Sequence, residues 1–358
     1  MKKIVVTGGG TAGHLFPAIT LGNELIRRGY ELHLFTDIRC KKYITEDVKL
    51  IAHIINVKLF PKGFLNKLKL FLSLLCVTLK LILLLMKIKP AAIIGFGGYP
   101  TFAPLLAALF LRIPIVVYEQ NSFLGKTNSF FLKYAAKVAL TYDDTKSSAN
   151  LDNAKKVVVG HIVRENVREL EVKDNFNHVP FRIFIFGGSQ GAKFFATLIP
   201  KAIKILVTAH PNIQLHITEQ AALEDHANII EIYNNLKLSY KLADFFYDMD
   251  QQYLNHELVI ARAGASTIAE LSYIGLPAIF IPLPTAADNH QFYNAKALEA
   301  SGAGWCFEQA KCTEAELADK LLVLIQNRDI LKQASLKLVK RKNDGSKTLA
   351  DTVEQIIN

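Results

Sequence analysis

The stretch GGGTAGHLFP, residues 8–17, follows directly on the apolar run Ile4–Val6. Three of its glycines have the spacing G-x-G-x-x-G, which in a strand–turn–helix unit brings a helix N-terminus against a dinucleotide phosphate. Asp37 follows a second apolar run, Leu32–Phe35, and lies a little over 20 residues after the last glycine of the motif. Nicotinamide-binding domains have their ribose-binding acid at about this distance. The stretch therefore predicts a strand, a phosphate-binding turn and a helix, and the first question is whether the protein is a dehydrogenase.

Two features argue against a dehydrogenase. His14 follows the last glycine of the motif at once, and Pro17 lies early in the helix that would have to bind phosphate. A second glycine turn, GGSQGAK (Gly187–Lys193), follows a later strand, and a G-x-G-x-x-G match alone is weak evidence. This second turn is not a P-loop either, because only three residues separate the glycines at 187 and 191 where four are required.

The positive charge is confined to the first half of the chain. The 358 residues hold 42 Lys+Arg and 32 Asp+Glu, a net charge of +10. Residues 1–160 hold 22 basic and 9 acidic side chains, a net charge of +13, so the remainder carries −3. This asymmetry indicates an anionic partner for the first half, such as nucleic acid, an anionic membrane surface or a phosphorylated lipid. No aromatic–basic motif supports nucleic acid, which is therefore not an expected partner.

Residues 64–89, FLNKLKLFLSLLCVTLKLILLLMKIK, form an apolar segment flanked by lysines. From Leu70 to Met86 there are 17 residues with a single charge, Lys80. A helix that spans a bilayer needs about 20 apolar residues, so a span is marginal. Two other interpretations stay open: a core helix of an α/β domain, and an interfacial helix whose lysines lie over lipid headgroups.

The cysteines and histidines predict neither disulfides nor a metal site. The four cysteines are scattered without a C-x-x-C pair, and the start MKKIVVTGGG has too short an apolar run for a secretory signal. We therefore expect reduced thiols in a cytoplasmic protein. The ten histidines have no H-x-x-x-H spacing, and the D-x-D at Asp248–Asp250 is too common by chance to predict a bound metal.

Short β-rich runs alternate with helical patterns along the whole chain, and the pattern restarts near residue 180. The expected strands are residues 4–7, 32–36, 51–57, 91–95, 114–119, 138–141 and 157–160, then 181–187, 214–218, 241–245, 258–261, 278–282 and 304–307. Such alternation predicts α/β folding with parallel sheets and helices on both faces. We predict two Rossmann-like, doubly wound domains facing a central cleft, residues 1–160 and 161–334, with a helix near 335–358 that packs back on either one.

Two further stretches contain candidate ligands. In RAGASTIAELSYIGLP, Thr267 and Glu270 have the spacing of a capping box, but Glu270 could instead accept hydrogen bonds from vicinal ribose hydroxyls. In DNHQFYNA, Gln291 and Asn294 are uncharged donor–acceptor groups at a loop–helix junction, which suits sugar hydroxyls as well as helix capping. The residues alone leave both alternatives open.

Six of these motifs together resemble the MurG family of peptidoglycan glycosyltransferases, in order and in approximate spacing. They are GGGTAGHLFPA, GFGGYPTFAP, YEQNSFLGKTN, GGSQGA, RAGASTIAE and HQFYNA, and they span nearly the whole chain. The resemblance implies a GT-B architecture and transfer of N-acetylglucosamine from UDP-N-acetylglucosamine to undecaprenyl-diphosphate-linked muramyl-pentapeptide. It also implies a basic N-terminal domain bound peripherally to the anionic cytoplasmic face of the bacterial inner membrane, with other cell-wall synthesis proteins as candidate partners.

The resemblance also implies a role for individual residues, with no metal and no other cofactor. The acceptor diphosphate would lie at Gly9, Gly10, Thr11 and His14. The donor would contact Thr11, Ala12, Gly13, Asn121, Arg164, Ser189, Gln190, Phe246, Glu270, Gln291 and Asn294. His14 would act as general base with Asn121 beside it, while Arg164 and the helix N-terminus at Ser189 meet the charge on departing UDP.

Three positions depart from the family pattern. Tyr118 stands where the family has histidine before Glu119-Gln120-Asn121, Ile162 replaces a proline before Val163-Arg164, and Tyr99-Pro100 varies a glycine turn. The first departure argues against a proton relay through that position. Two other classes of protein would share these motifs: a related GT-B enzyme with another donor or lipid acceptor, and a membrane-bound nucleotide-sugar sensor without turnover.

Overall fold

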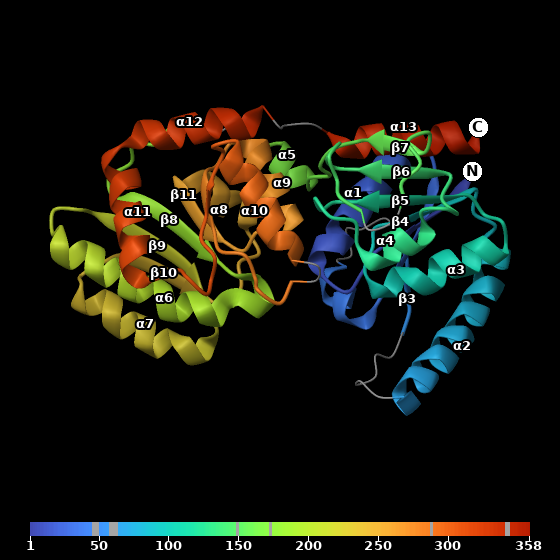
Figure 1. The fold of residues 1–358 in the computed structure, drawn as a ribbon, viewed down its shortest axis with the longest axis horizontal. Coiled ribbons are helices and arrows are strands. Elements are labelled where there is room, and N and C mark those ends of the chain that lie inside the picture. The colour runs from blue at the N-terminus through green and yellow to red at the C-terminus, as the bar shows by residue number, and fades with distance from the viewer. Residues whose placement is uncertain (45–49, 57–63, 148–149, 172–173, 287–288, 341–343) are drawn as a thin grey trace. The chain divides into compact units, whose positions relative to one another are not determined.

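A computed structural model describes residues 1–44, 50–56, 64–147, 150–171, 174–286, 289–340 and 344–358. The chain divides into two compact units. Unit 1 comprises Met1–Arg164 and Asn343–Asn358, and unit 2 comprises Glu165–Lys342. Each unit contains one parallel sheet with helices on both faces (Figure 1), which confirms the predicted fold class.

Unit 1 is built on a seven-stranded parallel sheet in the order β3-β2-β1-β4-β5-β6-β7. Its strands are β1 (Lys3–Thr7), β2 (Glu31–Thr36), β3 (Ile51–Ile54), β4 (Ala92–Gly95), β5 (Ile115–Glu119), β6 (Lys137–Leu140) and β7 (Lys156–Val158). Its helices are α1 (Ala12–Arg27), η1 (Ile38–Tyr43), α2 (Phe64–Ile88), η2 (Tyr99–Thr101), α3 (Phe102–Phe110), α4 (Lys126–Phe131) and α13 (Gly345–Ile357). The expected strands of the first half thus lie within a few residues of their places; Val57 lies outside the described residues.

Alternate residues of β1 pack on opposite faces of this sheet. Ile4 and Val6 join the cluster under α1 and α13, whereas Val5 joins the cluster under α2 and α3. Because both faces are covered, all three side chains are fully buried, which explains why the strand reads as a continuous apolar run.

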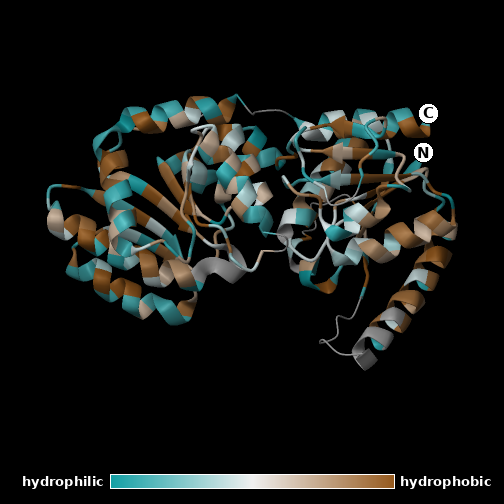
Figure 2. Cartoon of the chain, in the orientation of Figure 1, coloured by the Kyte–Doolittle hydropathy of each residue, from teal (hydrophilic) through white to brown (hydrophobic). Residues whose placement is uncertain are grey.

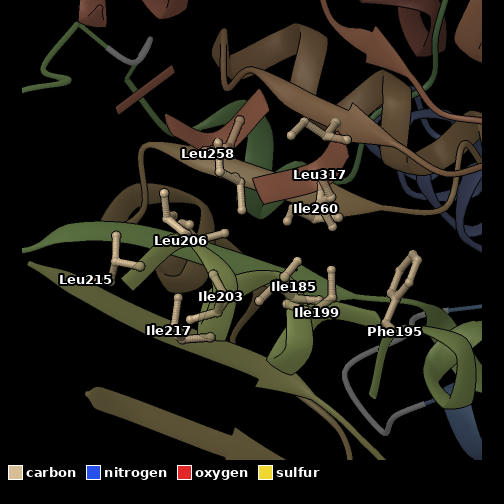
Figure 3. Close-up of a cluster of buried hydrophobic side chains, with 14 of the residues drawn as sticks. Ile185, Phe195, Ile199, Ile203, Leu206, Leu215, Ile217, Leu258, Ile260 and Leu317 are labelled. Atoms are coloured by element: carbon tan, nitrogen blue, oxygen red, sulfur yellow. The ribbon is translucent and has the colours of Figure 1, made fainter. Parts of the chain in front are cut away.

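Unit 2 repeats this organisation with six parallel strands in the order β10-β9-β8-β11-β12-β13. The strands are β8 (Phe181–Phe186), β9 (Leu215–Gln220), β10 (Ser239–Ala243), β11 (Leu258–Ala261), β12 (Ala278–Phe280) and β13 (Trp305–Cys306). The helices are α5 (Glu165–Arg168), α6 (Gly188–Ala209), α7 (Leu223–Asn235), α8 (Met249–Asn255), α9 (Ala265–Ile274), α10 (His290–Ala300), α11 (Glu314–Gln326) and α12 (Arg328–Val339). Ile185 faces α6 in the core drawn in Figure 3, whereas Phe184 contacts Phe246 on the opposite face.

The C-terminal helix α13 packs on α1 of unit 1, and ion pairs fix it there. Arg28 lies 3.0 Å from Glu24 of α1, 2.6 Å from Asp351 and 2.7 Å from Glu354 of α13. Lys2 also donates hydrogen bonds to the carbonyl of Ile357. The sequence left open which domain this helix would cover; the Arg28 network places it on unit 1.

Helix α2 has one buried and one exposed face. Leu81, Leu85 and Ile88 are buried in the unit 1 core. The opposite face carries an apolar stripe, defined here as Leu72, Leu75, Leu79, Leu83 and Met86, with exposed fractions of 46–63%. Figure 2 shows hydrophobic residues along the described length of this helix. Within the described residues, no helix is long and apolar enough to cross a membrane.

Glu219 of β9 is a buried carboxyl group whose protonation should make the stability of unit 2 depend on pH. Burial raises the pKa of Glu219 to about 8, and repulsion from nearby Asp225 adds to the rise. The Tyr233 hydroxyl, which donates to the Glu219 carboxyl group at 2.7 Å, acts against the rise. A carboxyl group with a raised pKa in the folded state stabilises the protein while it stays protonated. This contribution is present below the unfolded pKa and is lost as the pH rises through about 8.

We expect Glu219→Gln to flatten the fall in melting temperature between about pH 5 and pH 8, because glutamine accepts the Tyr233 hydrogen bond but has no proton to lose. Thermal unfolding at a series of pH values measures this. Glu224→Gln, at an exposed position on the neighbouring α7, is the matched control and should keep the wild-type slope. A wild-type slope in Glu219→Gln would contradict the assignment.

Candidate active site

The loop of residues 8–11 connects the carboxyl end of β1 to the N-terminus of α1. Gly8 N donates to Phe35 O of the neighbouring β2 at 3.2 Å, and Gly10 N donates to Asp37 Oδ1 at 3.1 Å. Gly10 has a φ of +84°, a conformation that glycine adopts without strain. The loop is therefore tied to the end of β2, with the first turn of α1 directly after it and its backbone N–H groups suited to an anion.

His14 lies in the first turn of α1 and is half-buried. Its Nδ1 lies 3.0 Å from the hydroxyl oxygen of Thr11. If Nδ1 carries the proton and donates to Thr11, the lone pair is on Nε2, which is the tautomer that a general base requires. The hydroxyl of Thr11, three residues before His14 in the motif, therefore serves to orient the His14 ring.

A second loop, Gly97–Gly98, packs against the ring of His14. A methyl group added to Gly97 would lie 3.4 Å from His14 Cδ2 and 3.4 Å from Asn128 Nδ2, so these two side chains line one small space. Gly98 has a φ of +81°, and a methyl group there would lie 2.6 Å from the carbonyl oxygen of Gly9. The absence of side chains at these positions is what lets the two loops meet.

Glu119 organises the loop that contains Asn121. Its Oε1 accepts from the backbone N and Nδ2 of Asn121 at 3.0 and 2.9 Å, and its Oε2 accepts from Gly125 N and Asn128 Nδ2 at 2.9 Å. Burial raises the pKa of Glu119, and these N–H donors oppose that rise. Glu119, Gln120 and Asn121 are all buried, so the side chain of Asn121 is oriented by Glu119.

Tyr118 and Arg164 have separate surroundings within unit 1. The buried Tyr118 hydroxyl contacts Thr141 Oγ1 at 3.0 Å and donates to Gly160 O at 3.1 Å. Tyr118 therefore belongs to the core between β5 and residue 160, in keeping with the argument against a proton relay through it. Arg164 stacks over the Phe16 ring, with Cζ 5.0 Å from its centroid, which places its guanidinium near the start of α1.

In unit 2, the glycine turn after β8 opens helix α6. Gly187 is the N-cap residue of α6, and Ser189 and Gln190 lie in its first turn; their side chains are outside what the structure describes. The four N–H groups at such a helix start lack intrahelical partners. This turn of unit 2 therefore has the same strand–turn–helix construction as the loop of residues 8–11 in unit 1.

Glu270 is not part of a capping box. Helix α9 begins at Ala265 with Gly264 as N-cap and without a side-chain cap, so Thr267 lies inside the helix. Glu270 is 5% exposed, and its Oε2 accepts from the Tyr253 hydroxyl at 2.8 Å. The capping interpretation is therefore wrong, and the role of the Glu270 carboxylate as a ligand of ribose stays a prediction.

The other unit 2 candidates make contacts of their own within that unit. Gln291 Oε1 accepts from Leu283 N at 3.0 Å. Asn294 is buried and donates to Ala263 O at 3.3 Å. Phe246 is also buried, with its ring against Phe184. These contacts give each residue a structural role, and direct contact with a sugar nucleotide stays a prediction for all three.

Asp248 of the D-x-D sequence occupies the N-cap position of helix α8, without a side-chain cap hydrogen bond. Its Oδ2 accepts from Gln252 Nε2 at 2.8 Å, while Asp250 lies in the first turn of the same helix. Across the described ranges, no three His, Cys, Asp or Glu side chains gather closely enough to hold a metal ion.

Two arginine environments lie beside the candidate residues but were not assigned from the sequence. Arg262 is 7% exposed, donates to Ile281 O and Pro282 O, and has its Cζ 4.7 Å from the Phe195 ring centroid. Burial lowers the pKa of Arg262 to about 10. Arg39 lies next to Asp37 at the end of β2. In the sequence, Asp37 was a signal for the Arg39 environment. A single arginine at a strand end gave no signal for the Arg262 environment.

Comparison with known proteins covers the entire chain. Residues 4–140 match the glycosyltransferase family 28 N-terminal domain, and residues 182–349 match the glycosyltransferase family 28 C-terminal domain. The UDP-N-acetylglucosamine–N-acetylmuramyl-(pentapeptide) pyrophosphoryl-undecaprenol N-acetylglucosamine transferase of Rickettsia bellii is 53% identical over 361 residues, covering 100% of both chains. The protein of the same name from Rickettsia canadensis is 53% identical over 359 residues, again covering 100% of both.

Solved structures agree with the sequence comparison. The crystal structure of Acinetobacter baumannii MurG superposes with a TM-score of 0.79 at 27% identity, covering 99% of this chain and 100% of that one. The glycosyltransferase VinC in complex with dTDP superposes with a TM-score of 0.66 at 15% identity, which concerns the fold alone. The GT-B fold expected from the resemblance is thereby confirmed.

The contact of Gly98 with Gly9 predicts a specific loss on substitution. In Gly98→Ala the new methyl group would meet the Gly9 carbonyl at 2.6 Å, in addition to the strain of a positive φ. Gly29→Ala is the matched control, because Gly29 has a φ of +91° but no atom within 4 Å of the added methyl. We expect Gly29→Ala to cost about 1–2 kcal/mol of unfolding free energy, and Gly98→Ala to cost a further ~1–3 kcal/mol from the collision. Denaturant unfolding of both variants measures the difference; equal losses would contradict the close packing of the two loops.

Proposed function

This chain belongs to glycosyltransferase family 28, and from that premise we propose that it transfers N-acetylglucosamine from UDP-N-acetylglucosamine to undecaprenyl-diphosphate-linked N-acetylmuramoyl-pentapeptide, converting lipid I to lipid II in peptidoglycan synthesis. The observation that carries the proposal is the 53% identity to the Rickettsia bellii transferase over the full length of both chains. The arrangement of two strand–turn–helix phosphate sites, one in each unit, supports it.

The reaction is a single displacement at the anomeric carbon of the donor. The 4-hydroxyl of the muramyl sugar attacks, so the α-linked donor gives a β-1,4 product with inversion. His14 Nε2 takes the hydroxyl proton while Nδ1–H donates to Thr11, the arrangement that the 3.0 Å contact supports. UDP leaves with the bonding electron pair, and its growing negative charge is met by Arg164 and the N–H groups at the start of α6.

The remaining candidates bind and orient the two substrates. The loop of residues 9–11 holds the acceptor diphosphate, with Ala12 and Gly13 of the first α1 turn close to the donor. Asn121, fixed by Glu119, orients the reacting sugar. In unit 2 Phe246 contacts the uracil, Glu270 the ribose, and Gln291 and Asn294 the donor sugar. No metal or other cofactor takes part in this proposal.

The protein acts at the cytoplasmic face of the inner membrane, bound peripherally through α2. The apolar stripe of α2 has the spacing of one helix face, and the exposed Lys80, Lys87 and Lys89 lie along or beside it. An apolar face bordered by lysines is suited to an anionic bilayer surface, where the leucines enter the acyl boundary. Other proteins of cell-wall synthesis are further candidate partners at that surface.

The proposed function is tested by transfer of labelled N-acetylglucosamine from UDP to a short-chain lipid-linked muramyl-pentapeptide, with EDTA present. We expect product in EDTA from the wild type, and a turnover reduced by roughly 10²-fold in His14→Ala with the donor KM nearly unchanged, since a general base contributes about this much. Binding of UDP-N-acetylglucosamine without any product would support a sensor instead of an enzyme. Unaltered turnover in His14→Ala would remove His14 from the mechanism while leaving the transferase in place.

The membrane proposal is tested by substitution in the apolar stripe. Leu83→Glu should lower partitioning onto phosphatidylglycerol-containing vesicles roughly tenfold or more, because inserting a leucine contributes about 1.5–3 kcal/mol. Leu336→Glu is the matched control, since Leu336 on α12 is 59% exposed against 63% for Leu83 but lies outside the stripe. Sedimentation with vesicles measures both variants. Equal loss of binding, or none in Leu83→Glu, would exclude α2 as the contact.

A further inference from the structure

We propose that Arg39 binds the diphosphate of the lipid-linked acceptor, and that Asp37 and Tyr99 position its guanidinium for this task. The inference rests on the proposed function, because it assigns a further binding residue to the same acceptor site. It concerns Asp37 directly after β2, Arg39 in η1 and Tyr99 at the start of η2, and the family motifs assigned a role to none of them.

The guanidinium of Arg39 is held on two sides. Its Nε donates to Asp37 Oδ2 at 2.9 Å, and its Cζ lies 4.8 Å from the centroid of the Tyr99 ring. The Tyr99 hydroxyl donates to the same Oδ2 at 2.8 Å. Burial acts to raise the pKa of Asp37, but the hydrogen bonds from Arg39, Gly10 and Tyr99 outweigh it, so the pKa lies below its usual range and the carboxylate is ionised.

The held guanidinium lies over the glycine loop. The other oxygen of Asp37, Oδ1, accepts from Gly10 N at 3.1 Å, so one buried carboxylate sets the position of both the loop and the arginine. Arg39 Nη2 lies 3.3 Å from the point where a Cβ on Gly10 would stand. An anion bound at the loop would therefore lie within reach of the guanidinium and of the N–H groups that begin α1.

The edge of the guanidinium that faces away from Asp37 is suited to phosphate. Arg39 binds Asp37 through Nε, and its side chain remains 51% exposed. The two Nη groups therefore present parallel donors on the opposite edge, the fork that binds two phosphate oxygens. A lysine could not hold Asp37 and bind a phosphate with this geometry.

A purely structural role for Arg39 would be to neutralise Asp37. The two roles can be separated, because Arg39→Gln alone leaves the Asp37 charge unbalanced beside the loop, where it would itself repel a diphosphate. The double variant Asp37→Asn/Arg39→Gln removes both charges, while asparagine can still accept from Gly10 N and donate to the Tyr99 hydroxyl. If Arg39 only neutralises Asp37, the double variant should recover the wild-type acceptor KM. If Arg39 binds phosphate, the acceptor KM of the double variant should stay well above that of the wild type.

The experiment measures the acceptor KM and the donor KM in the transfer assay for these variants. We expect Arg39→Gln to raise the KM for a short-chain diphosphate-linked acceptor about tenfold or more, with the UDP-N-acetylglucosamine KM within about twofold. The double variant should not return to the wild-type acceptor KM. Arg27→Gln is the matched control, because Arg27 is also half-exposed (44%) and paired to a carboxylate, Glu24, but at the far end of α1.

A second readout needs no turnover. Calorimetric titration with inorganic pyrophosphate should show weaker binding to Arg39→Gln than to the wild type and to Arg27→Gln. The proposal fails if the acceptor KM of Arg39→Gln stays within about twofold of wild type, if the double variant recovers, or if both KM values rise together with a fall in melting temperature. Absence of transfer by the wild type would instead refute the proposed function, and the pyrophosphate titration would still decide on Arg39. If Arg39→Gln does not fold, Arg39→Lys takes its place in both measurements and should show the same direction.

Discussion

The carboxylate of Asp37 joins three segments that are far apart in the sequence, and the candidate site of unit 1 depends on it. One oxygen holds the tip of the glycine loop through Gly10, and the other holds Arg39 and Tyr99. A buried carboxylate is costly unless its oxygens are satisfied, so burial of Asp37 requires all three partners to be in place together. Because Gly10 directly precedes the N-cap residue of α1, this bond to Asp37 also fixes the position of the first turn of α1, which contains His14.

Glu119, at the end of β5, is a second buried carboxylate whose oxygens need hydrogen-bond donors. It is buried, and its oxygens are satisfied by N–H groups of the loop that follows and of α4. Asn128, one of these donors, lies beside the small space that His14 also lines. Two buried acids therefore organise the loops at the ends of β2 and β5, and each loop owes its conformation to hydrogen bonds with its own carboxylate.

Helix α2 fits both of the interpretations that the sequence left open, a core helix and an interfacial helix. Its inner face closes the unit 1 core with Leu81 and Leu85, while its outer face retains exposed leucines. A core helix needs only the first face, so the second indicates a further partner. Amphipathicity of this kind is hard to see in the sequence because both faces are apolar, and only packing separates them.

The amino-acid sequence by itself determined the fold class, the places of the strands and the family, because these follow from local patterns: short β-rich runs that alternate with helical patterns, glycine turns after strands, and motifs in a given order. It could not decide between two roles for Glu270, since a capping box and a ligand share the same spacing; the start of α9 at Ala265 decided against the capping box. Nor could it pair Asp37 with Gly10 and Tyr99, or place α13 on α1 through Arg28. Those contacts join residues distant in the chain, and which distant groups meet is settled only when parallel strands bring their carboxyl ends together and buried charges must find partners.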